Sequence, residues 1–374
     1  MSTVLATSRA DRIAELDGLR GIAIAVVLWH HLVERALPPV SVSSLGWLRI
    51  ATNLSWSGVD LFFVLSGYFI VGILIDQRES PQLARVFYRR RAARVLPLYF
   101  ATLAVTFALI VARVPGSFHS FPAWIYATFF TNLALAATGT WDWLPLSVLW
   151  SLAVEEQFYI AAPWVVRAIA PARLPRFLAG LAIFALVARC LLVAAYPDGY
   201  FGAHVLTPLR MDGLALGALV AWAVRSESAR GFFTWLALRW APLLALGGAA
   251  IAALSLSRPL EGAPVLCVVG YSLLAVVFAL VLAIVAGVRP RALTRFLAAR
   301  PLAHLGRHSY FVYLWHTLVG AAVFQVLGAS DFLGAPLSAL LKVAVTVALT
   351  WTAATLSWKF FEGPLVAWGH RLAY

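Results

Sequence analysis

The feature that most constrains this chain is a series of long apolar runs, each close to 20 residues and each continuous in its hydrophobicity. Helices of about 20 apolar residues match the hydrocarbon core of a bilayer, whereas the strands of a membrane barrel would alternate apolar and polar residues. Hydrophobic residues make up 62% of the 374 residues and charged residues 12%, against about 25% charged in a soluble domain. The sequence therefore predicts an all-α, polytopic integral membrane protein.

Eleven apolar stretches are candidate spans, and they lie at 19–36, 56–75, 95–112, 122–138, 148–166, 177–195, 207–224, 240–257, 264–287, 305–328 and 336–358. The Lys and Arg residues select among them, because short cytoplasmic loops retain positive charge. If 122–138, which Trp, Phe and Pro interrupt, stays outside or re-enters, 22 of the 29 basic residues lie inside and four outside. We therefore expect ten crossings and cytoplasmic termini, in one multi-pass domain of the cytoplasmic (inner) membrane that covers residues 1–374.

Charge and cysteine content exclude several classes of protein. The formal net charge is +13, but nucleic-acid binding needs a basic face on a water-soluble domain, and no segment is long enough to form one. Cys190 and Cys267 both lie inside apolar runs, so neither a disulfide framework nor a metal site is expected. The first run follows three arginines as a signal peptide would, but it contains His30 and His31 and lacks a clear cleavage site. We interpret it as a span.

The first apolar run carries ionisable side chains that lipid does not tolerate without a partner or a function. They are Asp17, Arg20, His30 and His31. Eleven residues separate Arg20 from His31, which at about 100° per residue puts both on one helix face, about 16 Å apart along the axis. An imidazole is suited to removing a proton from a hydroxyl at neutral pH. His31 is therefore a candidate general base, the alternative being a structural histidine bonded to a carbonyl, and we expect His30 to be structural.

Further polar residues interrupt the later runs. Asp60 opens one span, and Ser66 and Gly67 lie inside it, where the glycine would let another helix approach closely. The basic run at 87–99 holds Arg90, Arg91 and Arg94, which suit either lipid headgroups or the phosphates of a nucleotide-type donor. Adjacent carboxylates at Glu155 and Glu156 are hard to explain by packing. Arg210 and Asp212 are expected to form a mutual salt bridge, and His316 lies in mid-span among aromatic residues.

Six strings carry a resemblance that covers residues from about 14 to about 364: L-D-G-L-R-G, G-V-D-L-F-F-V-L-S-G, R-R-A-A-R, W-S-L-A-V-E-E-Q-F-Y, R-M-D-G-L-A-L-G and G-R-H-S-Y-F-V-Y-L-W-H. In this order they resemble the acyltransferase-3 family of membrane O-acyltransferases, which acylate cell-surface polysaccharides, lipopolysaccharide, Nod factors and some macrolides. The family implies a ten-helix domain that takes an acyl group, most often acetyl, from cytoplasmic acyl-coenzyme A. It implies no permanently bound cofactor and no metal.

The resemblance also assigns residues. The arginine and histidine of the family's first-helix motif, both regarded as needed for activity, match Arg20 and His31, and its basic motif for the coenzyme's phosphates falls on Arg90, Arg91 and Arg94. His30 stands where the family usually has an aromatic or apolar residue. Some relatives carry a C-terminal SGNH-type hydrolase-like domain, which this sequence lacks, so we expect it to act alone, as a homo-oligomer or with a separate periplasmic partner.

The sequence leaves the mechanism and the acceptor open. His31 either removes a proton from the acceptor hydroxyl or receives the acyl group itself, with Glu155 or Glu156 orienting the imidazole, and Asp17, Asp60, Ser66, Arg210, Asp212 and His316 in support. The acceptor is expected to be a carbohydrate or glycolipid, the alternative being a macrolide-type small molecule. The predicted outer loops show only aromatics such as Trp47, Trp124, Trp141 and Trp143, which suit sugar stacking or interface anchoring.

Two other functions compete with acyl transfer. A proton-coupled transporter or flippase of a cell-envelope glycan precursor would also use intramembrane His, Glu and Arg, but it predicts repeat symmetry, and the sequence has no internal repeat. A catalytically silent scaffold in a polysaccharide assembly is the third hypothesis. Binding and consumption of acyl-coenzyme A distinguish the enzyme from both.

Overall fold

The computed structural model describes residues 14–34, 48, 52–196, 199–256, 266–328, 335–371 and 374. Every regular element within these ranges is a helix, which confirms the prediction of an all-α protein. Trp47, named above as an outer aromatic residue, lies outside the described residues.

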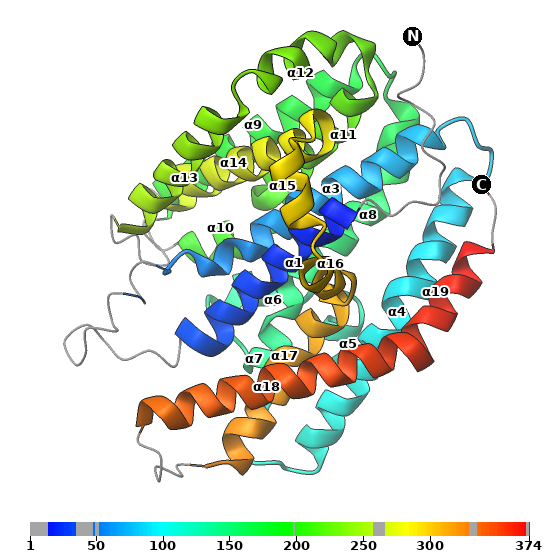
Figure 1. Ribbon diagram of the computed structural model, residues 1–374. Helices are drawn as coiled ribbons and strands as arrows, with labels where there is room; N and C mark the ends of the chain where they lie inside the picture. The colour runs from blue at the N-terminus through cyan, green and yellow to red at the C-terminus, as the bar shows by residue number, and fades with distance from the viewer. Residues whose placement is uncertain are drawn as a thin grey trace.

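Helix α1 (Ala14–Leu28) runs through the middle of the molecule and passes without a break into the π-helical turn η1 (Trp29–Val33) (Figure 1). A π-helical turn takes more residues per turn than an α-helix and is often found at functional sites. His30 and His31 lie in this turn, so the spacing of 100° per residue assumed from the sequence does not hold over the last residues before His31.

Glycines set how closely the central helices pack. A Cβ atom on Gly67 of α3 (Gly58–Asp76) would overlap the carbonyl oxygen of Leu214 in α11 (Met211–Arg225). A Cβ on Gly217 of α11 would overlap the carbonyl oxygen of Val64 in the same way. The two helices therefore cross with their backbones in contact, as expected for Gly67 from the sequence.

A second glycine contact holds α1 in place along its length. A Cβ on Gly306 of α16 (Arg300–Arg307) would overlap the carbonyl oxygen of Asp17, and a Cβ on Gly18 would overlap that of Leu297, the last residue of α15 (Arg291–Leu297). Helix α1 therefore has no room to slide or rotate against α15 and α16.

The other helices surround this centre. Helices α18 and α19 lie on the side of the molecule opposite α12 and α13 (Figure 1). The bounds are η3 (Ser55–Ser57), α4 (Leu83–Val111), α5 (Ala123–Ala127), α6 (Thr131–Thr138), α7 (Leu144–Ser147), α8 (Leu149–Ala168), α9 (Leu174–Ala195), α10 (Tyr200–Val205), η4 (Thr207–Arg210), η5 (Glu227–Ala229), α12 (Arg230–Ala237), α13 (Trp240–Leu256), η6 (Leu266–Gly270), α14 (Tyr271–Ala283), η7 (Ile284–Val288), α17 (Ser309–Val326), α18 (Ala335–Ser357), η8 (Trp358–Glu362) and α19 (Gly363–His370).

The protein is a multi-pass membrane protein. Six helical segments among the described residues are long and apolar enough to cross a bilayer, and a pair bent by 78° between α12 and α13 would make a seventh. Segment 122–138 forms only the short helices α5 and α6, neither of which is long enough to cross. Other predicted spans depart from an ideal span, since α11 has 15 residues and α8 carries Glu155, Glu156 and Arg167. The count of ten crossings and the cytoplasmic termini stay predictions.

Candidate active site

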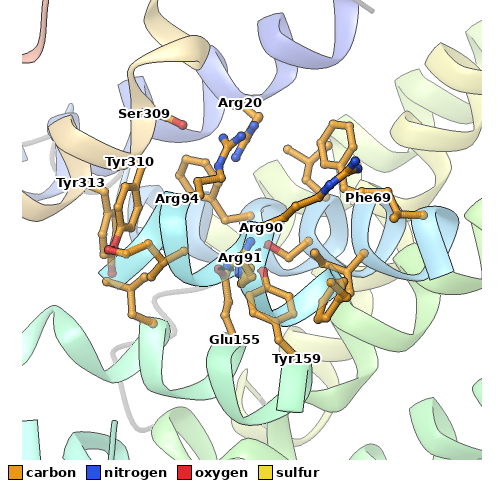
Figure 2. Close-up of a pocket in the computed structure, with 18 of the residues that line it drawn as sticks. Arg20, Phe69, Arg90, Arg91, Arg94, Glu155, Tyr159, Ser309, Tyr310 and Tyr313 are labelled. Atoms are coloured by element: carbon orange, nitrogen blue, oxygen red, sulfur yellow. Dashed lines mark hydrogen bonds and ion pairs between the residues drawn. The ribbon is translucent and has the colours of Figure 1, made fainter. Parts of the chain in front are cut away.

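A cavity of about 920 Å³ collects the arginines that the sequence singled out. Arg20 enters it from α1 and Arg90, Arg91 and Arg94 from α4, and Figure 2 shows these side chains converging on one space beside Glu155 of α8. We call it the arginine cavity. Asp17, Ser66 and the tyrosines Tyr159, Tyr310 and Tyr313 also line it, so it combines several guanidinium groups with hydroxyl donors.

Two carboxylates of α8 lie beside Arg91, and one of them, Glu155, lines the arginine cavity. Arg91 donates to Oε1 of Glu156 at 2.9 Å, and its guanidinium stacks 3.7 Å from the centre of the Tyr159 ring. Glu155 accepts hydrogen bonds from Ser66 at 2.8 Å and from Tyr159 at 3.0 Å. An ion pair whose charged groups also make hydrogen bonds to other side chains keeps its partners close to one geometry. These contacts give both carboxylates and Ser66 a role in positioning Arg91.

A second, smaller cavity of about 300 Å³ contains the histidines. His30 and His31 reach it from η1 and His204 from α10, and the other lining residues include three tryptophans, namely Trp56, Trp141 and Trp150. We call it the histidine cavity. Its lining is aromatic and imidazole in character, and among the described residues that line it none is Lys or Arg.

His31 is bonded to a second imidazole. Nδ1 of His31 lies 2.9 Å from Nε2 of His316, a fully buried residue of α17. Nδ1 of His316 in turn lies 3.0 Å from the carbonyl oxygen of Val312 and 2.8 Å from that of Tyr313. Carbonyl oxygens only accept hydrogen bonds, so Nδ1 of His316 carries the proton and its Nε2 accepts. His31 therefore donates from Nδ1, which leaves Nε2 as the basic nitrogen of its neutral ring.

His30 has different partners, which separates the two adjacent histidines. Its Nδ1 lies 3.2 Å from Oε2 of Glu34, one helical turn further on, and Glu34 also accepts a hydrogen bond from Ser55. His30 is thus bonded to a carboxylate one turn away, whereas His31 is bonded to a residue 285 positions away in the sequence.

The two cavities adjoin. Val59 of α3 and Tyr313 of α17 line both of them. The Tyr313 hydroxyl donates to the carbonyl oxygen of Val148 at 2.9 Å and lies 2.6 Å from the Ser151 hydroxyl, so its ring is fixed at the boundary. Val59 and Tyr313 therefore lie at the boundary between the arginines and His31.

One predicted ion pair is wrong. Arg210 does not pair with Asp212; it pairs with Asp60 of α3, while Asp212 pairs with Arg189 of α9 at 2.6 Å and accepts a hydrogen bond from Ser272 at 2.8 Å. Residues two apart on a helix point in different directions and do not meet. The two pairs join α3, α9, α11 and α14 through buried charges.

The Asp60–Arg210 pair also reaches the histidine cavity. The Arg210 guanidinium lies 4.0 Å from the centre of the Tyr271 ring, and the Tyr271 hydroxyl lies 2.9 Å from Nδ1 of His204. Burial, followed by the positive charge of Arg210, holds the pKa of His204 well below its usual range. His204 is therefore neutral in the wall of the cavity.

The structure brings the predicted residues together in two groups. Asp17, Arg20, Ser66, Arg90, Arg91, Arg94 and Glu155 line the arginine cavity, while His31 lines the histidine cavity with His316 behind it. Sequence reasoning missed His204, Trp150, Glu34 and Tyr313. Only Glu34 left a local signal, because it lies four residues after His30.

The chain is similar in sequence to known acyltransferases. The model of a family described as an acyltransferase domain matches residues 13–355. The O-acetyltransferase OatA of Staphylococcus aureus is 26% identical over 94% of this chain and 56% of its own length. The peptidoglycan O-acetyltransferase OatA of Listeria monocytogenes is 26% identical over 96% of this chain and 57% of its own length. The chain thus spans somewhat more than half the length of these relatives, and no solved structure matches it.

Proposed function

The chain belongs to this acyltransferase family, and from that premise we propose that it transfers an acyl group, most simply acetyl, from cytoplasmic acyl-coenzyme A to a hydroxyl of a cell-envelope glycan. Two of the relatives described above are O-acetyltransferases, one of them named for peptidoglycan, and a glycan of that kind is the proposed acceptor. The proposed location is the inner membrane, where the donor is reached from the cytoplasm and the acceptor from the outer side.

The arginine cavity is the proposed donor site. Guanidinium groups bind phosphates through paired hydrogen bonds, and four of them face one space here. Ligand sites for cofactor-sized molecules have volumes of about 300–1,000 Å³, and this cavity has about 920 Å³. We assign phosphate binding to Arg20, Arg90, Arg91 and Arg94 together, because all four line the cavity. The predicted topology puts the residues of α4 that carry these arginines on the cytoplasmic side.

His31 is the proposed base. Its Nε2 removes the proton of the acceptor hydroxyl as the hydroxyl oxygen attacks the thioester carbonyl carbon. The new C–O bond forms, the C–S bond breaks, and the departing thiolate takes the proton from the imidazolium, so that the products are an ester and free coenzyme A. The bond from Nδ1 of His31 to the neutral ring of His316 fixes the tautomer and orientation of His31, which is the positioning part of the role that a carboxylate has in other acyl-transfer sites.

A covalent relay uses the same nitrogen. In that route Nε2 of His31 first receives the acyl group and then passes it to the hydroxyl. The two routes share the donor site, the acceptor side and the role of His316, and they differ in whether an acyl-imidazole forms before the acceptor binds. Rapid quenching of the enzyme with labelled acyl-coenzyme A in the absence of acceptor distinguishes them.

The observation that carries the proposal is the His31–His316 bond in a cavity that adjoins the arginines. Inverted membrane vesicles supplied with labelled acetyl-coenzyme A give the test. We expect His31→Ala to lower transfer of label to glycan by about 10²–10⁴-fold, the usual contribution of a positioned base. His119→Ala, which changes a histidine outside both cavities, is the control and should retain most activity. Full transfer by the His31→Ala variant would overturn the assignment.

A further inference from the structure

We propose that the histidine cavity is the acceptor subsite and that it binds one uncharged pyranose ring of the glycan, with Trp141 as the stacking platform at its entrance. This inference rests on the proposed function and names the substrate class and the residues that recognise it. The case depends on the charge, the size and the exposed tryptophan of the cavity.

The lining of the cavity suits an uncharged sugar. A pyranose presents C–H groups on its faces and hydroxyl groups at its edge, so aromatic rings with a few polar atoms between them recognise it. Here Trp56 and Trp150 form the buried wall, and the His204 ring lies between them, with ring centres 5.6 Å and 4.8 Å away. Neutral His204 offers hydrogen bonds without charge.

Among the described residues that line the cavity, only Asp142 carries a carboxylate, and its oxygens already accept hydrogen bonds within the protein. Asp142 accepts hydrogen bonds from the backbone N–H of Ser120 at 3.1 Å, the Ser120 hydroxyl at 2.9 Å, the Trp143 N–H at 2.7 Å and the Tyr126 hydroxyl. Four donors satisfy both of its oxygens, so it does not act as a free charge toward a ligand. What it does is fix the backbone on either side of itself, and Trp141 is the residue immediately before it.

The size of the cavity selects one ring. About 300 Å³ lies at the lower end of the range for ligand sites, too small for an oligosaccharide. A longer glycan must therefore leave through the entrance. Trp141 is 45% exposed, while Trp150 and Trp56 are 5% and 7% exposed, so Trp141 is the aromatic surface available where the chain emerges.

The sequence alone did not distinguish Trp124 from Trp141 as candidates for sugar stacking, but the structure does. Trp124 and Trp141 both lie on the predicted outer segment and both are exposed, at 58% and 45%. Trp141 lines the cavity that holds His31 and packs 5.7 Å from the His204 ring, whereas Trp124 is not part of that lining. Interface anchoring accounts for Trp124, and stacking against a ligand accounts for Trp141.

The test compares variants of these two tryptophans in the full-length protein in nanodiscs. The probe is a β-1,4-linked tetramer of N-acetylglucosamine, titrated at saturating labelled acetyl-coenzyme A, with direct binding of the tetramer followed by saturation-transfer NMR. We expect Trp141→Ala to raise the KM for the tetramer about tenfold, because the variant removes the exposed aromatic face on which the sugar would stack. Trp141→Tyr should restore most of the affinity, and Trp124→Ala should leave it unchanged.

The outcomes are distinguishable. In the Trp141→Ala variant the affinity for acetyl-coenzyme A should be unchanged, because Trp141 does not line the arginine cavity. An unchanged KM for the tetramer in both Trp141→Ala and Trp150→Ala overturns the acceptor subsite. So does a wild-type protein that binds acetyl-coenzyme A yet neither binds nor acetylates the tetramer. Failure of the proposed function is a different result, in which the wild type does not bind acetyl-coenzyme A at all.

Discussion

The arginine cavity and the histidine cavity adjoin at Val59 and Tyr313, yet they have opposite chemistry. The first has about 920 Å³ and is lined by four arginines; the second has about 300 Å³ and is lined by tryptophan and histidine. The difference suggests a division of labour in which charge recognition of a carrier takes place in one space and proton transfer in another. A base beside four guanidinium groups would be kept from accepting a proton, since a nearby positive charge disfavours the imidazolium.

The largest predicted effect is that of replacing His316, the hydrogen-bond partner of His31. Replacement by alanine removes the acceptor that fixes the tautomer of His31, and we expect kcat to fall roughly 100-fold or more, because loss of a tautomer-fixing partner is costly in related acyl-transfer sites. The KM for acetyl-coenzyme A should not change. Steady-state kinetics of detergent-purified protein give both constants.

The control for His316 is a conservative variant. In His316→Gln the amide oxygen can still accept from Nδ1 of His31, so part of kcat should return. If alanine and glutamine variants are equally impaired while their thermal stability equals that of the wild type, His316 does not act through that bond.

A second prediction concerns Val59, which lies at the boundary between the two cavities. Val59→Trp places a large ring where the two cavities meet, and overpacking of this kind costs about 1–3 kcal/mol. We expect transfer to fall roughly 10- to 100-fold while calorimetry still detects binding of acetyl-coenzyme A. Val59→Ile is the matched control and should lose little. Equal loss of donor binding in the tryptophan variant would argue that the boundary is not on the route of the acyl group.

The smallest effect is expected from single arginines. Arg94→Ala removes one charged contact to phosphate, which is worth about 1.5–3 kcal/mol when fully formed and less in a cavity open to water. The KM for acetyl-coenzyme A should rise about tenfold, and more steeply at low salt, with no change in the KM for the glycan tetramer. Arg176→Ala, which changes an exposed arginine outside both cavities, is the control. A rise in the glycan KM for Arg94→Ala would show that the cavities are not independent.

Composition and local pattern predicted the parts of this protein that depend on one segment at a time. Continuous apolar runs indicated helices, Gly67 indicated close helix packing, and the string around Arg20 and His31 indicated a site. Each of these follows from a single helix in a bilayer, and the first two are confirmed by the structure.

Contacts between helices could not be predicted in the same way. The sequence paired Arg210 with Asp212 because they are close in the chain, but the crossing of α3 with α11 brings Asp60 to Arg210. His316 becomes the partner of His31 only because α17 packs beside η1. Which residue faces which cavity depends on helix crossings and on the π-helical turn, and neither leaves a periodic signal in one sequence.

Helix α1 contributes Arg20 to one cavity, its continuation η1 contributes His31 to the other, and glycine contacts with α15 and α16 fix the position of α1. The distance between Arg20 and His31 is therefore fixed. Their separation of eleven residues corresponds to about 16 Å of helix, and under the proposed reaction an acyl group must reach about that far beyond Arg20 to meet the base. The site would therefore select a donor by the length of the arm between its phosphates and its thioester as well as by its charge. A thioester on a shorter arm would not reach His31.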